Sequence, residues 1–124
     1  MKITALSDGT VPQDLHVLLR NTTNEKTDAL LAEGLLSNPV EASINAFLFQ
    51  DGNRLVLVDT GAGEFFGSGF GGKLLSSLAS VGVSPEQITD ILLTHAHDEH
   101  MGGLVQGGQL IFPKRDRPPG QARP

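Results

Sequence analysis

Residues 94–103 read THAHDEHMGG and contain three of the four histidines of this 124-residue chain. The apolar run at residues 91–93 (ILL) precedes them and predicts a buried strand. Residues two apart in an extended segment face the same side, so His95 and His97 are expected to project together from the end of that strand. Imidazole nitrogen is a good ligand for Zn²⁺ and related divalent metals. The stretch therefore predicts a metal site; the alternative is a solvated polar loop whose histidines titrate freely.

More donor atoms follow directly. Asp98, Glu99 and His100 offer carboxylate oxygens and a third imidazole. The two glycines at residues 102–103 allow the backbone to turn closely behind the site. A site at the carboxyl end of a strand is usual in layered α/β sheets, which favours that fold class here.

Three strands are expected upstream of this stretch. Residues 43–49 (SINAFLF) and 54–58 (RLVLV) predict strands, and residues 51–52 (DG) predict a hairpin turn between them. The second strand is almost wholly apolar, so we expect it to be buried on both faces. Residues 2–6 predict a first strand, which a turn at residues 7–9 (SDG) would end.

Helices are expected between these strands. Thr22 and Glu25 have the spacing of a capping box, and Asn24 is an alternative cap. That helix is expected to end near Gly34. It should bury Ala29, Leu30 and Leu31. A second helix is expected over residues 73–81, and residues 84–87 (SPEQ) carry the chemistry of a third helix start.

Composition excludes several classes of protein. The chain has 9 basic and 14 acidic residues, a formal net charge of −5, and no cysteine. A disulfide scaffold and a thiolate metal site are thereby excluded, and the acidic balance argues against nucleic-acid binding. No apolar run approaches the roughly 20 residues that span a bilayer. Residues 1–5 (MKITA) lack the apolar core of a signal peptide, so we expect a cytoplasmic protein.

The last eleven residues differ from the rest. Residues 114–124 (KRDRPPGQARP) contain four basic residues, one acid and three prolines. Nothing in this segment is suited to a packed core, so it predicts a disordered basic tail after a single domain over residues 1–113.

The THAHDEHMGG stretch resembles the metallo-β-lactamase superfamily pattern Thr-His-x-His-x-Asp-His-x-Gly-Gly. The segments ITALSDGT, SINAFLF and LVLVDTGAG occur in the matching order and are similar to methyl parathion hydrolase-like members, which sit near the quorum-quenching lactonases. The resemblance implies an αβ/βα sandwich. It also implies one or two Zn²⁺ or other divalent transition-metal ions, and hydroxide-driven hydrolysis of a small-molecule ester, lactone or organophosphate.

The resemblance also assigns residues to the metals. By position, His95 and His97 would serve the first metal, and His100 would serve the second together with the residue before it. The family has Asp there, and this chain has Glu99. Glu is longer by about one C–C bond, ~1.5 Å, so we expect a poor ligand or a supporting acceptor and a weakened second site. Asp98 could replace it only if the backbone turned.

The family takes its remaining metal ligands, two His and an Asp, from later in the domain. After Met101 this chain has no histidine, and its only acid is Asp116. We therefore expect the N-terminal part of the fold, apparently truncated and impaired as an enzyme. The alternative is a non-catalytic fragment with weak metal binding. Uncovered apolar sheet surface would then favour a homo-oligomer.

Asp59 ends the strand in LVLVDTGA. The resemblance implies that it supports a ligand histidine from behind the metal; a carboxylate that caps the following turn is the alternative. The same residues are also similar to the retroviral-type aspartic protease motif, in which two Asp59 carboxylates of a dimer would share a proton. A chelator would leave such protease activity unchanged, whereas it would abolish the activity of a metal-dependent hydrolase.

Overall fold

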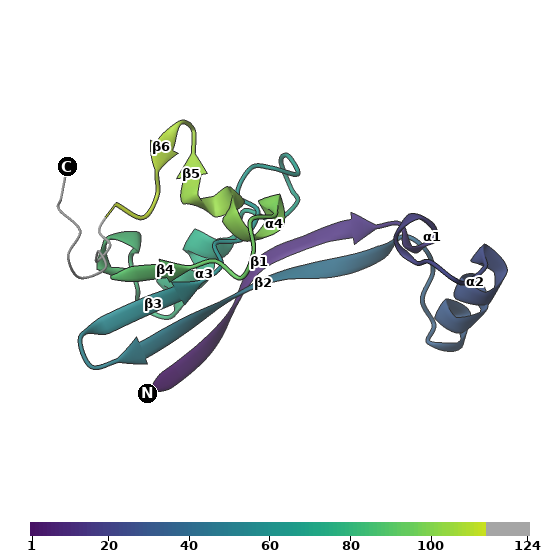
Figure 1. Ribbon diagram of the computed structural model, residues 1–124, viewed down its shortest axis with the longest axis horizontal. Coiled ribbons are helices and arrows are strands. Elements are labelled where there is room, and N and C mark those ends of the chain that lie inside the picture. The colour runs from purple at the N-terminus through teal and green to yellow at the C-terminus, as the bar shows by residue number, and fades with distance from the viewer. Residues whose placement is uncertain (114–124) are drawn as a thin grey trace.

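The computed structural model describes residues 1–113, and a four-stranded sheet forms its body (Figure 1). The strands lie in chain order. They are β1 (Lys2–Gln13), β2 (Val40–Asp51), β3 (Arg54–Val58) and β4 (Asp90–Leu92). Successive strands run antiparallel except β3 and β4, which are parallel. The predicted tail, residues 114–124, lies outside the described residues.

The connections follow the expected local chemistry. Asp51 pairs with Arg54 across a two-residue turn, and Gly52 supplies its positive φ of 59°, so the predicted hairpin is confirmed. The crossover from β3 to β4 contains α3 (Leu74–Ser80) and the short 3₁₀ helix η1 (Pro85–Gln87). The third predicted helix thus stops after one turn, although its Ser84–Gln87 capping box is present.

The hydrophobic core lies between one face of the sheet and α3. Side chains from all four strands and from the crossover meet there, because alternate residues of a strand share a face. The core residues are Leu6, Ala46, Leu48, Leu57, Leu74, Leu78, Val83, Ile88 and Phe112, with Ile91 packed against them.

The opposite face of the sheet is apolar and uncovered within residues 1–113. Register aligns Ala5, Phe47, Val58 and Leu92 in one row across it. Phe47 is 43% exposed and Leu92 is 56% exposed. The predictions that β3 is buried on both faces and that β4 is a buried strand are therefore wrong. The reason is that α3 covers only the other face.

The predicted turn at residues 7–9 is also wrong. β1 continues through it, and the register shifts between Ser7, which pairs with Asn45, and Gly9, which pairs with Ile44. Asp8 is the extra, unpaired residue of a β-bulge. The bulge keeps the chain in the sheet and turns the Asp8 side chain inward, where it is 1% exposed.

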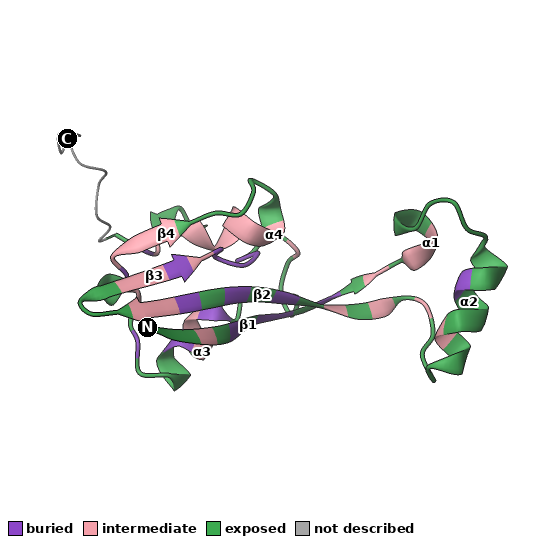
Figure 2. Ribbon diagram, turned by 60° about the horizontal axis from the view of Figure 1, so that its bottom comes forward, coloured by how far each residue is buried: buried purple, intermediate pink, exposed green. Residues whose placement is uncertain are grey.

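Beyond the bulge, β1 and β2 continue as a twisted ribbon that projects from the body (Figure 2). Its end bears two helices, α1 (Leu15–Leu18) and α2 (Asn24–Glu33), which we call the arm. Thr23 caps α2 by accepting from the Lys26 amide, so the predicted caps, Thr22 and Asn24, are each wrong by one residue. Gly34 ends the helix as predicted.

The predicted burial of α2 is wrong. Leu30 is 68% exposed, and Thr27 is the one buried residue of this helix. Its apolar side chains remain exposed because α2 packs against α1 at the end of the ribbon, away from the main core.

Four short elements follow β4 within the described residues. These are α4 (Asp98–Met101), the 3₁₀ helix η2 (Gly102–Leu104), and the small hairpin of β5 (Val105–Gln106) and β6 (Gln109–Leu110). In the part of the chain that the structure describes, no helix has the length and apolar character needed to cross a bilayer.

Candidate metal centre

The parallel pairing of β3 and β4 brings two distant segments to one edge of the sheet. Val58 pairs with Leu92, and the Asp59 amide donates to the Leu92 carbonyl at 2.8 Å. Asp59 and Thr94 therefore leave the carboxyl ends of neighbouring strands, the edge at which ligands bind in α/β sheets. Asp59 has a φ of 62°, and this left-handed conformation turns the chain immediately after the strand.

A short helix then presents the remaining histidine. His97 precedes α4 in an extended conformation, and the His100 amide donates to the His97 carbonyl at 2.9 Å. This single turn places Glu99 and His100 back towards the end of β4. The extended loop predicted after the strand is thus limited to residues 93–97.

The Asp59 carboxylate is hydrogen-bonded to the side chain of His100. Its Oδ2 lies 2.7 Å from His100 Nδ1, and a second contact comes from the Thr94 amide to Oδ1 at 2.8 Å. Burial alone would raise the pKa of Asp59, but the hydrogen bonds from Thr94 and His100 outweigh it and hold this pKa below its ordinary value. An ionised carboxylate only accepts, so Nδ1 of His100 donates and Nε2 of the neutral ring keeps its lone pair.

The Thr94 hydroxyl extends this arrangement to a second histidine. Its oxygen lies 2.9 Å from Asp59 Oδ2 and 3.0 Å from His95 Nδ1. Since the single hydroxyl proton goes to the carboxylate, the oxygen is free to accept from Nδ1 of His95. The partners thus assign the same tautomer to both rings, with Nε2 available to a metal.

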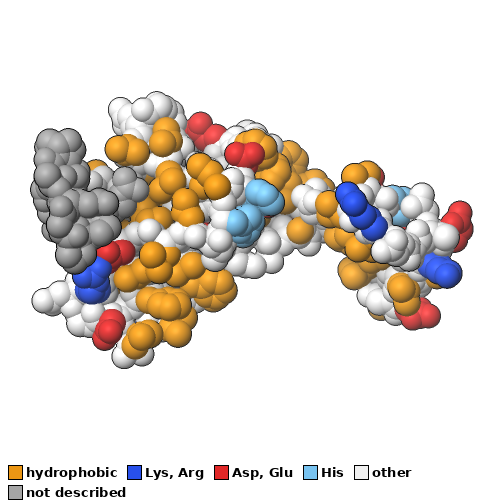
Figure 3. Space-filling view, in the orientation of Figure 1, with side chains coloured by type: hydrophobic (Ala, Val, Ile, Leu, Met, Phe, Trp, Pro, Cys, Tyr) orange, Lys and Arg blue, Asp and Glu red, His pale blue; other side chains and the backbone are white. Residues whose placement is uncertain are grey.

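Three predicted ligands lie together. His95, Glu99 and His100 each offer a donor atom, and these atoms lie within 4.8 Å of one another. Glu99 Oε1 is 3.9 Å from His100 Nε2. Figure 3 shows the histidines as an exposed patch on the body of the molecule, apart from the single histidine of the arm. We call His95, Glu99 and His100 the donor group.

His97 lies beside the donor group without belonging to it. Its ring centroid is 4.5 Å from that of His95, in an edge-on arrangement, so the predicted proximity of these two side chains is confirmed. Its Nδ1 is 3.8 Å from Glu99 Oε1, and its side chain is 72% exposed. In the structure, Glu99 lies with both His95 and His100. The resemblance instead assigned His95 and His97 to one metal, and Glu99 and His100 to the other. Asp98 is exposed and lies outside the donor group.

Close backbone packing supports the site from behind. Thr60 donates to the His100 carbonyl from its amide at 2.7 Å and from its hydroxyl at 3.0 Å, and the Gly103 amide donates to the Gly61 carbonyl at 3.1 Å. A Cβ on Gly102 or on Gly103 would overlap the backbone of residues 60–62. The expected close approach of the two glycines is thus confirmed.

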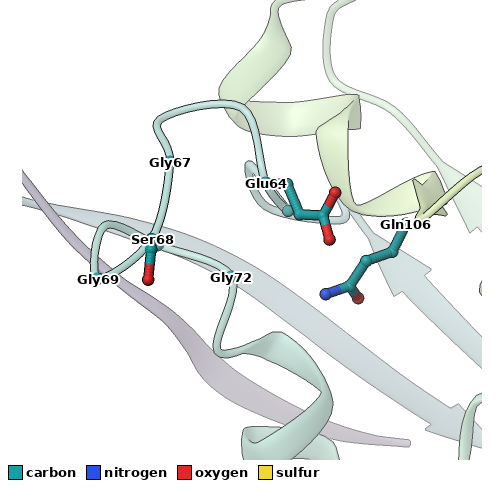
Figure 4. A pocket seen from close by; sticks show the side chains of 8 residues that line it. Glu64, Gly67, Ser68, Gly69, Gly72 and Gln106 are labelled. Carbon is teal, nitrogen blue, oxygen red and sulfur yellow. The ribbon is translucent and has the colours of Figure 1, made fainter.

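A glycine-rich loop lies on the other side of this backbone. This loop and Gln106 line an open cavity of about 390 Å³. None of the predicted metal ligands lines it. Figure 4 shows the Glu64 and Gln106 side chains pointing into the same space. The cavity is separate from the donor group.

Two residues of the site were missed by sequence reasoning. Thr94 begins the THAHDEHMGG stretch, and its position between Asp59 and His95 explains why a hydroxyl is present there. Asp8 was interpreted as a turn residue, although it lies buried against the loop that follows Asp59. The sequence has no signal that distinguishes a bulge at Asp8 from a turn. The pairing of β1 with β2 identifies the bulge.

The donor group fits a divalent transition metal. Two imidazoles whose Nε2 atoms are available and one carboxylate are ligands that Zn²⁺ takes in proteins, and His97 is a fourth donor nearby. The fixed Nδ1 partners are the kind of support that metal-binding histidines have.

Comparison with known proteins identifies the family. Residues 40–114 match the family model of the metallo-beta-lactamase superfamily. The mouse metallo-beta-lactamase domain-containing protein 1 is 45% identical over 49 residues, which are 40% of this chain and 17% of that protein.

Two solved structures cover most of the chain. The hydrolase AbOPH of the beta lactamase superfamily is 38% identical, with a TM-score of 0.82. AidC, a dizinc quorum-quenching lactonase solved with a product, is 32% identical, with a TM-score of 0.81. Each match covers 91% of this chain and 39% of the other chain, so the chain spans about two fifths of their length. By sequence family and by fold, the chain belongs to the metallo-β-lactamase superfamily.

Proposed function

We propose that this chain carries metal ligands of a metal-dependent hydrolase that acts on esters, lactones or phosphotriesters. The observation that carries the proposal is the convergence of the His95, Glu99 and His100 donor atoms within 4.8 Å. Buried structural histidines would not explain this arrangement, because His95 is exposed and Glu99 and His100 are half-exposed.

The residues have separate roles in this proposal. His95, His97, Glu99 and His100 would hold the metal. When bound, a divalent metal lowers the pKa of a coordinated water and polarises the oxygen of a carbonyl or phosphoryl group. Asp59 holds His100 directly, and it holds His95 through Thr94, so that both rings keep Nε2 towards the donor group.

The relatives support the metal and the substrate class. AidC is described as a dizinc lactonase with a product bound, and AbOPH is described as a hydrolase. Zn²⁺ and a small lactone, ester or organophosphate are therefore our proposals for this chain. The three substrates share an electrophilic carbonyl or phosphoryl centre, which is why one kind of site can serve them.

A zinc titration of the purified full chain tests the metal site. We expect the wild-type chain to bind Zn²⁺ and the His95→Ala/His97→Ala double variant to lose most of that binding. His16→Ala is the matched control, because His16 lies on the arm, where its ring is hydrogen-bonded to Asp28. Zinc uptake that is unchanged in the double variant would refute the site.

Turnover separates the activity from the metal site. Because this chain lacks the ligands that the family takes from later in the domain, we expect the zinc-loaded chain to hydrolyse a γ-lactone, a p-nitrophenyl ester or a phosphotriester only weakly, and a chelator to abolish this activity. Zinc binding without turnover of any of the three would instead support the alternative of a non-catalytic metal-binding chain. The aspartic protease alternative is not favoured, because Thr94 and His100 of the same chain already occupy the Asp59 carboxylate.

A further inference from the structure

Asp8 is a buried carboxylate that is far in sequence from the donor group and has no role in the proposed function. It is 1% exposed. Its oxygens accept from three main-chain amides: Ala62 at 2.9 Å, Gly72 at 3.0 Å and Leu74 at 3.0 Å. Hydrogen bonds from amides to a charged acceptor are stronger than neutral ones, and a buried amide that loses its acceptor is costly.

The β-bulge in β1 explains this position. The extra residue turns the Asp8 side chain into the molecule, and such bulges are frequent next to functional sites, where they redirect a side chain. The main chain adds to the attachment, because the Lys73 amide donates to the Asp8 carbonyl at 2.9 Å. Both ends of the loop from Ala62 to Leu74 are thus fixed to one residue of β1.

The loop end that Asp8 holds is the support of the donor group. Ala62 follows directly after Thr60 and Gly61. The Thr60 amide donates to the His100 carbonyl, and the Gly61 carbonyl accepts from the Gly103 amide. Asp8 is therefore separated from the His100 backbone by one three-residue segment.

Residues 60–62 lie in close contact with Asp8 and with the metal-binding loop. A Cβ on Gly61 would overlap the Asp8 carboxylate on one side, and a Cβ on Gly102 would overlap the Ala62 backbone on the other. Contacts this close transmit a displacement from one segment to the next. A change at Asp8 is therefore expected to move residues 60–62, and with them the backbone at residues 100–103.

We propose that Asp8 is a positioning residue for the metal-binding loop: it fixes residues 60–62 and so holds His100 where it can bind the metal. The inference rests on the proposed function. It adds a residue, 92 positions before His100, whose contribution to metal binding passes through the backbone alone.

Zinc affinity of the full chain tests the proposal. Asp8→Asn keeps the volume of the side chain but places an NH₂ donor against main-chain N–H donors. We expect Zn²⁺ binding to weaken about tenfold, the lower end of the range for residues that support metal ligands. Asp14→Asn is the matched control, because Asp14 also accepts from a main-chain amide but lies on the arm. Its Zn²⁺ affinity should equal that of the wild type.

A second control separates positioning from stability. Leu78→Ala removes a fully buried side chain from the main core cluster, to which none of residues 60–62 belongs. Measured at a temperature at which both variants are fully folded, Leu78→Ala should keep wild-type Zn²⁺ affinity. Equal weakening in Asp8→Asn and Leu78→Ala would overturn the proposal, since loss of stability would then explain both.

Hydrogen exchange of the metal-free chain gives a readout that needs no metal. We expect Asp8→Asn to speed exchange at least tenfold at the Thr60 and Gly103 amides, which do not contact Asp8. A change confined to Ala62, Gly72 and Leu74 would overturn the proposal. If the wild-type chain takes up no Zn²⁺, the proposed function fails, whereas unchanged Zn²⁺ affinity in Asp8→Asn refutes only the role of Asp8.

Discussion

The Asp59 carboxylate accepts a hydrogen bond from Nδ1 of His100 at 2.7 Å, across 41 positions of sequence. The contact exists because β3 and β4 are parallel and end at the same edge of the sheet. It also determines the chemistry of the ring, because it leaves Nε2 as the nitrogen that can bind a metal.

Asp59→Asn is expected to weaken Zn²⁺ binding about 10- to 100-fold. The amide has one acceptor oxygen in place of two and carries no charge, so it cannot accept from both Thr94 and His100 as the carboxylate does. Competition with a chromophoric chelator measures the affinity. Asp28→Asn is the matched control, because it removes a carboxylate at 2.7 Å from His16 on the arm. If the wild type and both variants bind Zn²⁺ with equal affinity, Asp59 only caps the turn that follows β3.

Thr94→Val is expected to weaken Zn²⁺ binding about tenfold, because it leaves Nδ1 of His95 without its hydroxyl partner. Valine has nearly the shape of threonine, so packing is little changed. Thr94→Ser keeps the hydroxyl and should restore most of the affinity. If serine weakens binding as much as valine does, the hydroxyl alone does not explain the role of Thr94.

Much of this site could be predicted from the sequence, since its three histidines lie within residues 95–100. The hairpin at residues 51–52 and the cap of α2 were equally local and were predicted to within one or two residues. The inward position of Asp8 and the half-buried outer face of β3 could not be predicted. A bulge is defined by pairing with a distant strand, and burial is defined by which face α3 covers.

Glu99→Gln is expected to weaken Zn²⁺ binding tenfold or more, because a neutral amide oxygen is a poor zinc ligand. Asp98→Asn, at the neighbouring position, is the control. Asp98 is exposed and lies outside the donor group, so the Zn²⁺ affinity of this variant should equal that of the wild type. Zinc-to-protein ratios at saturation add a second readout. Unchanged affinity in Glu99→Gln would mean that Glu99 lies beside the metal without binding it.

Zinc should stabilise the folded chain in proportion to its occupancy. At a free Zn²⁺ concentration of 100 times Kd, linkage adds about 2.7 kcal/mol to the free energy of unfolding. Urea unfolding with and without a chelator measures the difference. The His95→Ala/His100→Ala double variant should show none of it, and a zinc effect that persists in this variant would place the ion elsewhere.

Self-association is expected through the uncovered face of the sheet. Phe47 and Leu92 lie in one row across it, both more than 40% exposed, and a contiguous apolar surface of this kind favours association. Phe47→Thr/Leu92→Thr places β-branched residues in the strands and should shift sedimentation towards the monomer. Leu30→Thr, at a 68% exposed position of the arm, is the control and should leave association unchanged. If Leu30→Thr alone disperses the protein, the arm is the contact, because its apolar side chains are the other large exposed set within residues 1–113.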